Sequence, residues 1–98
     1  MNIPDIWVSY WVCEYVNLIA MVISHMETDY KYYTMKITKD LLGDTVLICR
    51  YGSKHDRYAN QQTIVIQSWE EGISIAQQRL KIRYHHGYKA EFLIPELA

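Results

Sequence analysis

The chain has 98 residues, which fits one domain of common size, and half of them are hydrophobic. This composition is enough for a folded core without disulfides or a metal. A formal net charge of −1 argues against a protein that coats nucleic acid through bulk charge. The ten Lys and Arg residues all fall within 29–89, against six acidic residues there, and this local excess of four positive charges weakly favours an anionic partner.

The N-terminal segment is apolar and rich in aromatic residues. Residues 6–15 mix Trp, Tyr and Val, which favours an extended strand over a helix. Residues 6–23 are apolar enough to suggest a membrane span, but Glu14 and Asn17 in the middle argue against one. The basic region and cleavage site of a signal peptide are also missing, so we expect a cytoplasmic protein with no membrane partner.

The next part of the chain predicts a hairpin. Residues 18–26 form an apolar run, and residues 31–38 alternate between apolar and polar side chains, as in a half-buried strand. Turn-forming residues at 27–29 join the two segments. The apolar face of the second strand is expected to hold Tyr33, Met35 and Ile37.

Two more strands are predicted after the hairpin. A tight turn at 42–44 leads into a strand over 45–51. Residues 52–62 are polar and are expected to form a loop, and residues 63–66 form a short strand after it.

The firmest local prediction is a helix. Ser68 and Glu71 form a capping box at its start, and Gly87 ends it after a basic last turn. Its apolar stripe consists of Trp69, Ile73, Ala76, Leu80 and Tyr84. Residues 92–94 add a last short strand. The expected fold is α+β, a twisted antiparallel sheet of five to six strands with one amphipathic helix packed across it.

In the order and spacing of these elements, the chain resembles a WGR domain, the small module of some poly(ADP-ribose) polymerases and of many short bacterial proteins. Gly43, the serine-plus-acid helix start and Gly87 match the pattern, while the family's Trp-Gly-Arg falls on Tyr51-Gly52-Ser53. The resemblance covers 18–89. The expected organisation is a single WGR-like domain over 1–98, with 1–17 as an aromatic extension and 90–98 as a C-terminal tail.

The resemblance implies a non-enzymatic module that binds DNA. In the better-known members the motif tryptophan stacks on a nucleic-acid end, and the arginine ties the module to DNA or to a neighbouring domain. Tyr51 can still stack on a sugar or base, but Ser53 cannot supply a guanidinium group. The expected contact residues, in the loop after the motif and near the helix end, are Arg50, Tyr51, Lys54, Arg57, Arg79 and Arg83.

Other kinds of site find little support in the sequence. The histidines at 85–86 point in different directions on a helix, and His25 and His55 are isolated. Cys13 and Cys49 have no neighbouring base and are expected to be buried free thiols. No glycine-rich phosphate loop is present. We therefore expect no enzyme activity, no cofactor, no metal and no small-molecule substrate.

The aromatic extension leaves a second function open. Trp7, Tyr10 and Trp11 place large side chains near the start of the chain. They either complete the core or form a surface for a protein partner, because exposed aromatic residues mark binding sites. A free edge strand would also allow homodimerisation. The alternative function is therefore protein–protein interaction or self-association.

Overall fold

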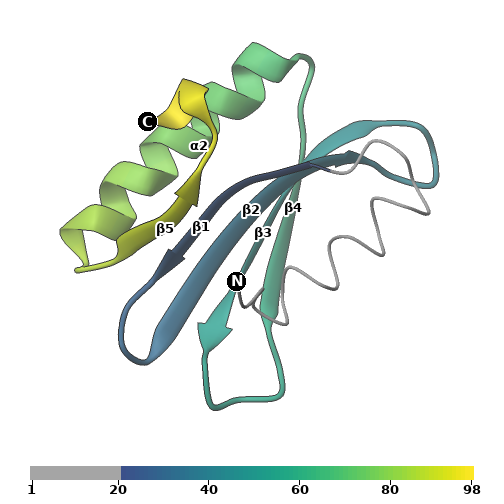
Figure 1. The fold of residues 1–98 in the computed structure, drawn as a ribbon. Coiled ribbons are helices and arrows are strands. Elements are labelled where there is room, and N and C mark those ends of the chain that lie inside the picture. Colours follow the sequence, from purple (N-terminus) through teal and green to yellow (C-terminus); the bar gives the residue numbers. More distant parts are fainter. Residues whose placement is uncertain (1–20) are drawn as a thin grey trace.

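The computed structural model describes residues 21–98, which form a five-stranded antiparallel sheet with one helix against it (Figure 1). The order across the sheet is β4-β3-β2-β1-β5. The α+β prediction is therefore confirmed. In chain order the elements are β1 Met21–Glu27, β2 Lys31–Lys39, β3 Thr45–Ser53, β4 Asn60–Val65, α2 Trp69–His85, β5 Lys89–Leu93 and the 3-10 turn η1 Pro95–Leu97.

The two predicted turns of the first three strands are both present. Between β1 and β2, Thr28 Oγ1 accepts hydrogen bonds from the backbone N–H groups of Tyr30 and Lys31, at 3.2 and 2.9 Å. Such local bonds from a threonine hydroxyl favour a turn. Between β2 and β3, Asp40 Oδ1 accepts hydrogen bonds from the backbone N–H groups of Leu42 and Asp44, both at 2.9 Å. Gly43 in this turn has a φ of 87°, a backbone angle that favours glycine.

The predicted boundaries of the loop between β3 and β4 are wrong. β3 continues to Ser53, and β4 begins at Asn60 instead of Thr63, so the loop shrinks to 54–59. Tyr51 pairs with Asn60 across the two strands. Polar residues can occupy this strand because β4 lies at the edge of the sheet, where all its side chains except that of Ile64 are exposed.

The core lies between α2 and one face of the sheet. As predicted, Tyr33, Met35 and Ile37 point into it from β2; Cys49, a buried free thiol, joins them from β3. Gly72 lets the helix approach closely. A Cβ atom there would lie 2.8 Å from Ile66 Cδ1 and 2.9 Å from Ile37 Cδ1, so even alanine would push those side chains aside.

The start of α2 follows the prediction closely. Ser68 Oγ accepts the backbone N–H of Glu71 at 3.1 Å. The Glu71 carboxylate accepts the N–H of Gln67 at 3.2 Å, one residue earlier than in a standard capping box. Both bonds satisfy donors around the first turn.

The end of α2 confirms the glycine stop and corrects the apolar stripe. Gly87 has a φ of 88°, and the N–H of Tyr88 donates to Arg83 O at 3.0 Å, as in a Schellman motif. Tyr84 was expected on the buried stripe but is 48% exposed. The helical spacing from buried Leu80 turns Arg83 toward the sheet instead.

The C-terminal residues belong largely to the fold. β5 pairs with β1, and it begins three residues before the strand predicted at 92–94. Ile94 donates its N–H to Ile23 O at 3.1 Å, and both Ile94 and Leu97 are buried. Within residues 21–98, no helix is both long and apolar enough to cross a membrane.

Candidate nucleic-acid interface

One end of the sheet brings two loops together, and we call it the loop end. The β1–β2 turn and the loop 54–59 are adjacent, since the N–H of Lys54 donates to Tyr30 O at 2.8 Å. Helix α2 finishes at the same end, because Lys89, two residues after Gly87, pairs with Glu27 of β1 (Figure 1). Sequence segments far apart in the chain therefore share this end.

On the helix side of the sheet, near the loop end, two arginines and three tyrosines form an arginine–tyrosine cluster. Its members are Tyr33, Tyr51, Arg79, Arg83 and Tyr88. The rings of Tyr33 and Tyr51 stack with centroids 5.6 Å apart. The Arg83 guanidinium carbon lies 4.2 Å from the Tyr33 centroid, 5.7 Å from that of Tyr88 and 6.0 Å from that of Tyr51. These distances suit cation–π attraction.

Arg79 is held in place by two neutral groups. Its Nη1 donates to Tyr33 Oη at 3.3 Å and to Gln62 Oε1 at 2.8 Å. Burial lowers the pKa of Arg79, but the hydrogen bond to Tyr33 and the electrostatic effects of Tyr33, Cys49 and Tyr51 together outweigh burial, so the pKa lies above its ordinary value. Burial raises the pKa of Tyr33, and the neighbouring Cys49 raises it further, so the tyrosine stays neutral. The charge of the pair therefore remains on Arg79.

No carboxylate in residues 21–98 neutralises either arginine. The two ion pairs described in this range both involve Glu27, which lies on β1. Arg83 also has a buried Nε with no hydrogen-bond partner. One turn of helix thus carries two guanidinium groups whose charge is not cancelled locally, an arrangement suited to binding an anion.

The structure brings together half of the predicted DNA-binding residues. Tyr51, Arg79 and Arg83 all belong to the cluster. Tyr51, however, is half-buried and uses its ring to stack on Tyr33, so it is not an open platform for a base.

The other predicted contact residues lie apart from the cluster. Arg50 is exposed on the face of the sheet opposite the cluster. Side chains alternate between the two faces along a strand, and Arg50 pairs with Thr34, which lies on that opposite face. Lys54 forms an ion pair with Glu27 at 2.8 Å, and Arg57 is exposed in the loop 54–59. The predicted interface residues Trp7, Tyr10 and Trp11, like Cys13, fall outside the described residues.

Two exposed tyrosines at the loop end were missed by the sequence reasoning. Tyr58 is 82% exposed and follows Arg57, and Tyr30 is 68% exposed and precedes Lys31. A signal was available, since both tyrosines lie in polar turn segments that offer no buried position. An aromatic ring beside a cation is a common arrangement at nucleic-acid surfaces.

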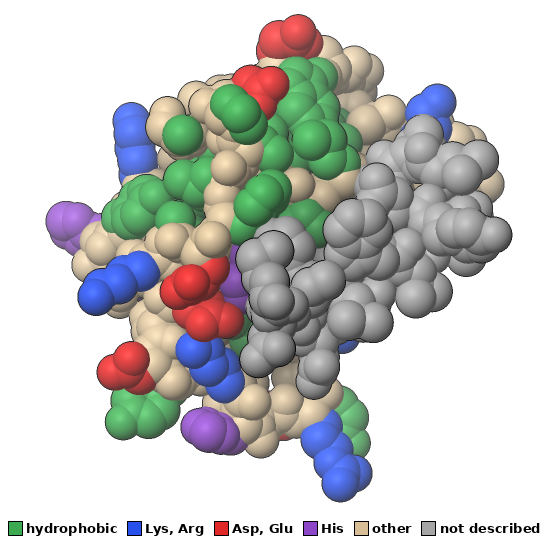
Figure 2. Space-filling view, viewed as in Figure 1, with side chains coloured by type: hydrophobic (Ala, Val, Ile, Leu, Met, Phe, Trp, Pro, Cys, Tyr) green, Lys and Arg blue, Asp and Glu red, His purple; other side chains and the backbone are tan. Residues whose placement is uncertain are grey.

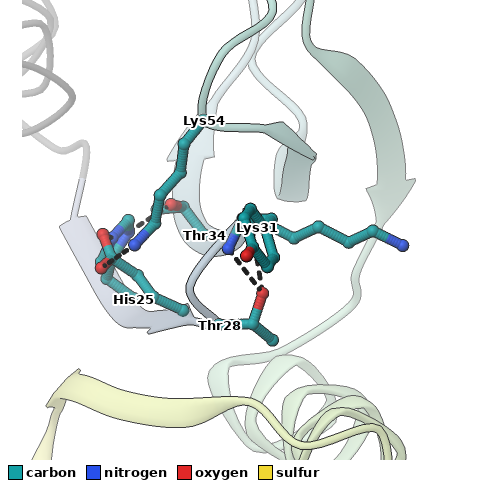
Figure 3. A network of polar contacts seen from close by, with 7 residues as sticks. His25, Thr28, Lys31, Thr34 and Lys54 are labelled. Carbon is teal, nitrogen blue, oxygen red and sulfur yellow. Dashed lines mark hydrogen bonds and ion pairs between the residues drawn. The ribbon is translucent and has the colours of Figure 1, made fainter.

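A buried histidine network was also missed. His25 faces away from α2 and is 2% exposed. Its Nδ1 shares a hydrogen bond with Thr34 Oγ1 at 2.7 Å, and its Nε2 donates to Glu27 Oε1 at 2.9 Å. Figure 3 shows the Lys54 side chain, from the first residue after β3, reaching toward the network, and its Nζ lies 2.8 Å from Glu27 Oε2. The sequence could not reveal this network because the hairpin register creates it.

The network predicts a dependence of stability on pH. Burial raises the pKa of Glu27, but the hydrogen bonds from Lys54 and His25 outweigh it, and the pKa lies below the usual 4.5. The ionised carboxylate therefore stabilises the fold above that value, and the contribution is lost as the pH falls through the lowered pKa. As the pH is lowered from about 6 to about 3, the free energy of unfolding should fall less for Glu27→Gln than for the unsubstituted protein, because glutamine has no carboxylate to protonate. Thermal melts at a series of pH values test this, and parallel curves for the two proteins would contradict it.

One open pocket lies beyond the C-terminal end of α2 and another lies beside the helix, and the lining of neither indicates a particular ligand. One, of about 310 Å³, lies at the loop end, and its mixed charges largely offset one another. Its lining is Glu27, Thr28, Asp29, Lys54, Gly87, Lys89 and Glu91. The other, of about 350 Å³, lies between α2 and Leu97. In Figure 2 hydrophobic side chains gather over α2 and the C-terminal elements, whereas Lys and Arg stand apart from one another on this face.

Comparison of the chain with protein-family models, curated proteins and solved structures gives no match. Among residues 21–98, no group of three or more His, Cys, Asp or Glu side chains is placed to hold a metal ion. Functional inference for this chain therefore depends on the geometry of the cluster and of the loop end.

Proposed function

We propose that this chain is a small, non-enzymatic nucleic-acid-binding module whose contact surface is the arginine–tyrosine cluster together with the loop 54–59. The observation that carries the proposal is the pairing of Arg79 and Arg83 with neutral groups alone in the described part of the chain. A guanidinium group is a planar fork of donors that matches phosphate oxygens, and a carboxylate partner would cancel its attraction for them.

The fixed position of Arg79 favours binding. Both of its hydrogen bonds use Nη1, which leaves Nη2 and Nε to donate to an anion. Because Tyr33 and Gln62 already restrict the side chain, less conformational entropy is lost when it contacts a phosphate. Arg83 adds a second positive charge one turn further along α2.

In this proposal the residue that stacks on a base is Tyr58 and not Tyr51. Tyr58 is largely exposed, and Arg57 lies beside it in the loop. A ring at this position stacks on any base, while the arginines contact the backbone, so binding is expected to depend little on base sequence. The resemblance of residues 18–89 to a WGR domain agrees with a nucleic-acid ligand but places the stacking residue differently.

The test uses Arg79→Gln and a matched control, Arg50→Gln. Both remove one positive charge, but Arg50 is on the opposite face of the sheet. Fluorescence anisotropy of a labelled blunt-ended DNA duplex, titrated at two or more salt concentrations, gives the affinity and its salt dependence. We expect Arg79→Gln to weaken binding and to reduce the slope of log K against log salt by about one, because one phosphate contact is lost.

Arg50→Gln should leave both quantities close to those of the unsubstituted protein. Equal losses for the two variants would show that total charge, and not the cluster, governs binding. An absence of binding by the unsubstituted protein at low salt would overturn the proposed function itself. A thermal melt of Arg79→Gln confirms that the domain is folded.

A further inference from the structure

The two edges of the sheet differ in how they are protected. β5 carries charges at Lys89 and Glu91, its register with β1 shifts between His25 and Met26, and Pro95 follows it. Charged residues, bulges and proline are the usual devices that stop an edge strand from pairing with another chain. β5 is therefore protected against pairing with a strand of another chain.

β4 lacks all of these devices. Its six residues, Asn60–Val65, include no charge and no proline, and its register with β3 is regular throughout. In the sheet formed by residues 21–98 it is an edge strand, and five of its six residues are exposed. An edge of this kind is open to pairing with a further strand.

The direction of the free backbone groups follows from one hydrogen bond. The N–H of Ile66 donates to Thr45 O at 3.0 Å. Backbone bonding alternates along an antiparallel pair, so Ile64 and every second residue before it also face β3. The N–H and C=O groups of Gln61, Thr63 and Val65 consequently point outward, with Thr63 at the centre.

We infer that two copies of this chain associate through antiparallel pairing of their β4 strands, with the two-fold axis at Thr63. In this register Thr63 lies opposite Thr63 of the second copy, and Gln61 lies opposite Val65 on both sides of the axis. The arrangement provides roughly six backbone hydrogen bonds. The partner is a second copy because the outward backbone groups of β4 are symmetric about Thr63, so two β4 strands can pair with each other. The strand has no charged residue, so no like charges face each other across the pair.

The dimer has a defined consequence for the arginine–tyrosine cluster. The two-fold axis of such a pair stands perpendicular to the sheet, so both α2 helices lie on the same side of one continuous sheet. Gln62, which holds Arg79, points to that side from β4. If the proposed function holds, two clusters flank the seam and one nucleic acid can engage both, which raises the apparent affinity.

Sedimentation velocity of the full chain, from low micromolar to near millimolar concentration, tests the inference. We expect a concentration-dependent shift from monomer to dimer, since strand pairing buries less surface than the standard stable interface. Thr63→Lys places two like charges opposite each other at the axis and should raise the dimer dissociation constant about tenfold. Ser74→Lys adds the same charge at an exposed position of α2 and should dimerise like the unsubstituted protein.

A charge-pairing experiment then locates the axis. Thr63→Glu alone should also dimerise more weakly than the unsubstituted protein, but an equal mixture of Thr63→Lys and Thr63→Glu should form a heterodimer because the two charges now attract. A mixture that remains monomeric, an unsubstituted protein that remains monomeric, or a Thr63→Lys variant that dimerises normally would each overturn the inference. Circular dichroism melts confirm that the variants are folded. None of these outcomes depends on nucleic-acid binding, so the two proposals fail separately.

Discussion

Replacement of Tyr33 by alanine is expected to lower the free energy of unfolding by about 3–5 kcal/mol. Tyr33 lies on the central strand β2 and has the largest fully buried side chain in residues 21–98. Its ring stacks on Tyr51 and carries the Arg83 guanidinium above it. Removal of the ring leaves a cavity that β2, which is bonded on both sides, cannot close. Urea denaturation followed by circular dichroism measures the change by linear extrapolation.

Tyr33→Phe is the matched control. It keeps the ring, the stack and the cation–π contact, and it removes only the hydroxyl that accepts from Arg79 at 3.3 Å. Because that bond is long and Arg79 also has Gln62, we expect a loss of about 1 kcal/mol or less. A small loss for Tyr33→Ala, similar to that of Tyr33→Phe, would mean that the ring does not support the core and the cluster as described.

The features that could be predicted from the sequence depend on neighbouring residues. The alternation through Met35 gave the buried face of β2, and Ser68 with Gly87 marked the two ends of α2. Each of these signals acts within a few residues of its own position, through side-chain direction, a cap bond or a backbone angle. Such effects operate before any tertiary contact forms.

The features that could not be predicted depend on pairing at a distance. Asn60–Gln62 reads as loop because its side chains are polar, and it becomes strand only because β3 supplies hydrogen-bond partners. His25 meets Thr34 through the hairpin register, which includes an irregularity between Val22 and Ser24. The placement of Tyr51 beside Arg83 depends on how α2 crosses the sheet, and no local pattern encodes that angle.

The His25 network leads to the second large expected effect. His25→Ala should lower the free energy of unfolding by about 2–4 kcal/mol, because it creates a cavity and leaves the buried Thr34 hydroxyl without this partner. Glu27 keeps its ion pair with Lys54, so the loss is smaller than that for an unpaired buried charge. Urea denaturation at neutral pH measures the effect.

A double-mutant cycle separates the hydrogen bond from the cavity. Thr34→Val removes the hydroxyl at nearly constant volume, and on its own it should be destabilising because it deprives His25 Nδ1 of that bond. Once His25 is alanine, the same substitution should cost less, since the hydroxyl no longer has the imidazole to bond. We therefore expect a coupling energy of about 0.5–3 kcal/mol between the two positions. Additive losses would show that the bond between His25 and Thr34 contributes nothing measurable to stability.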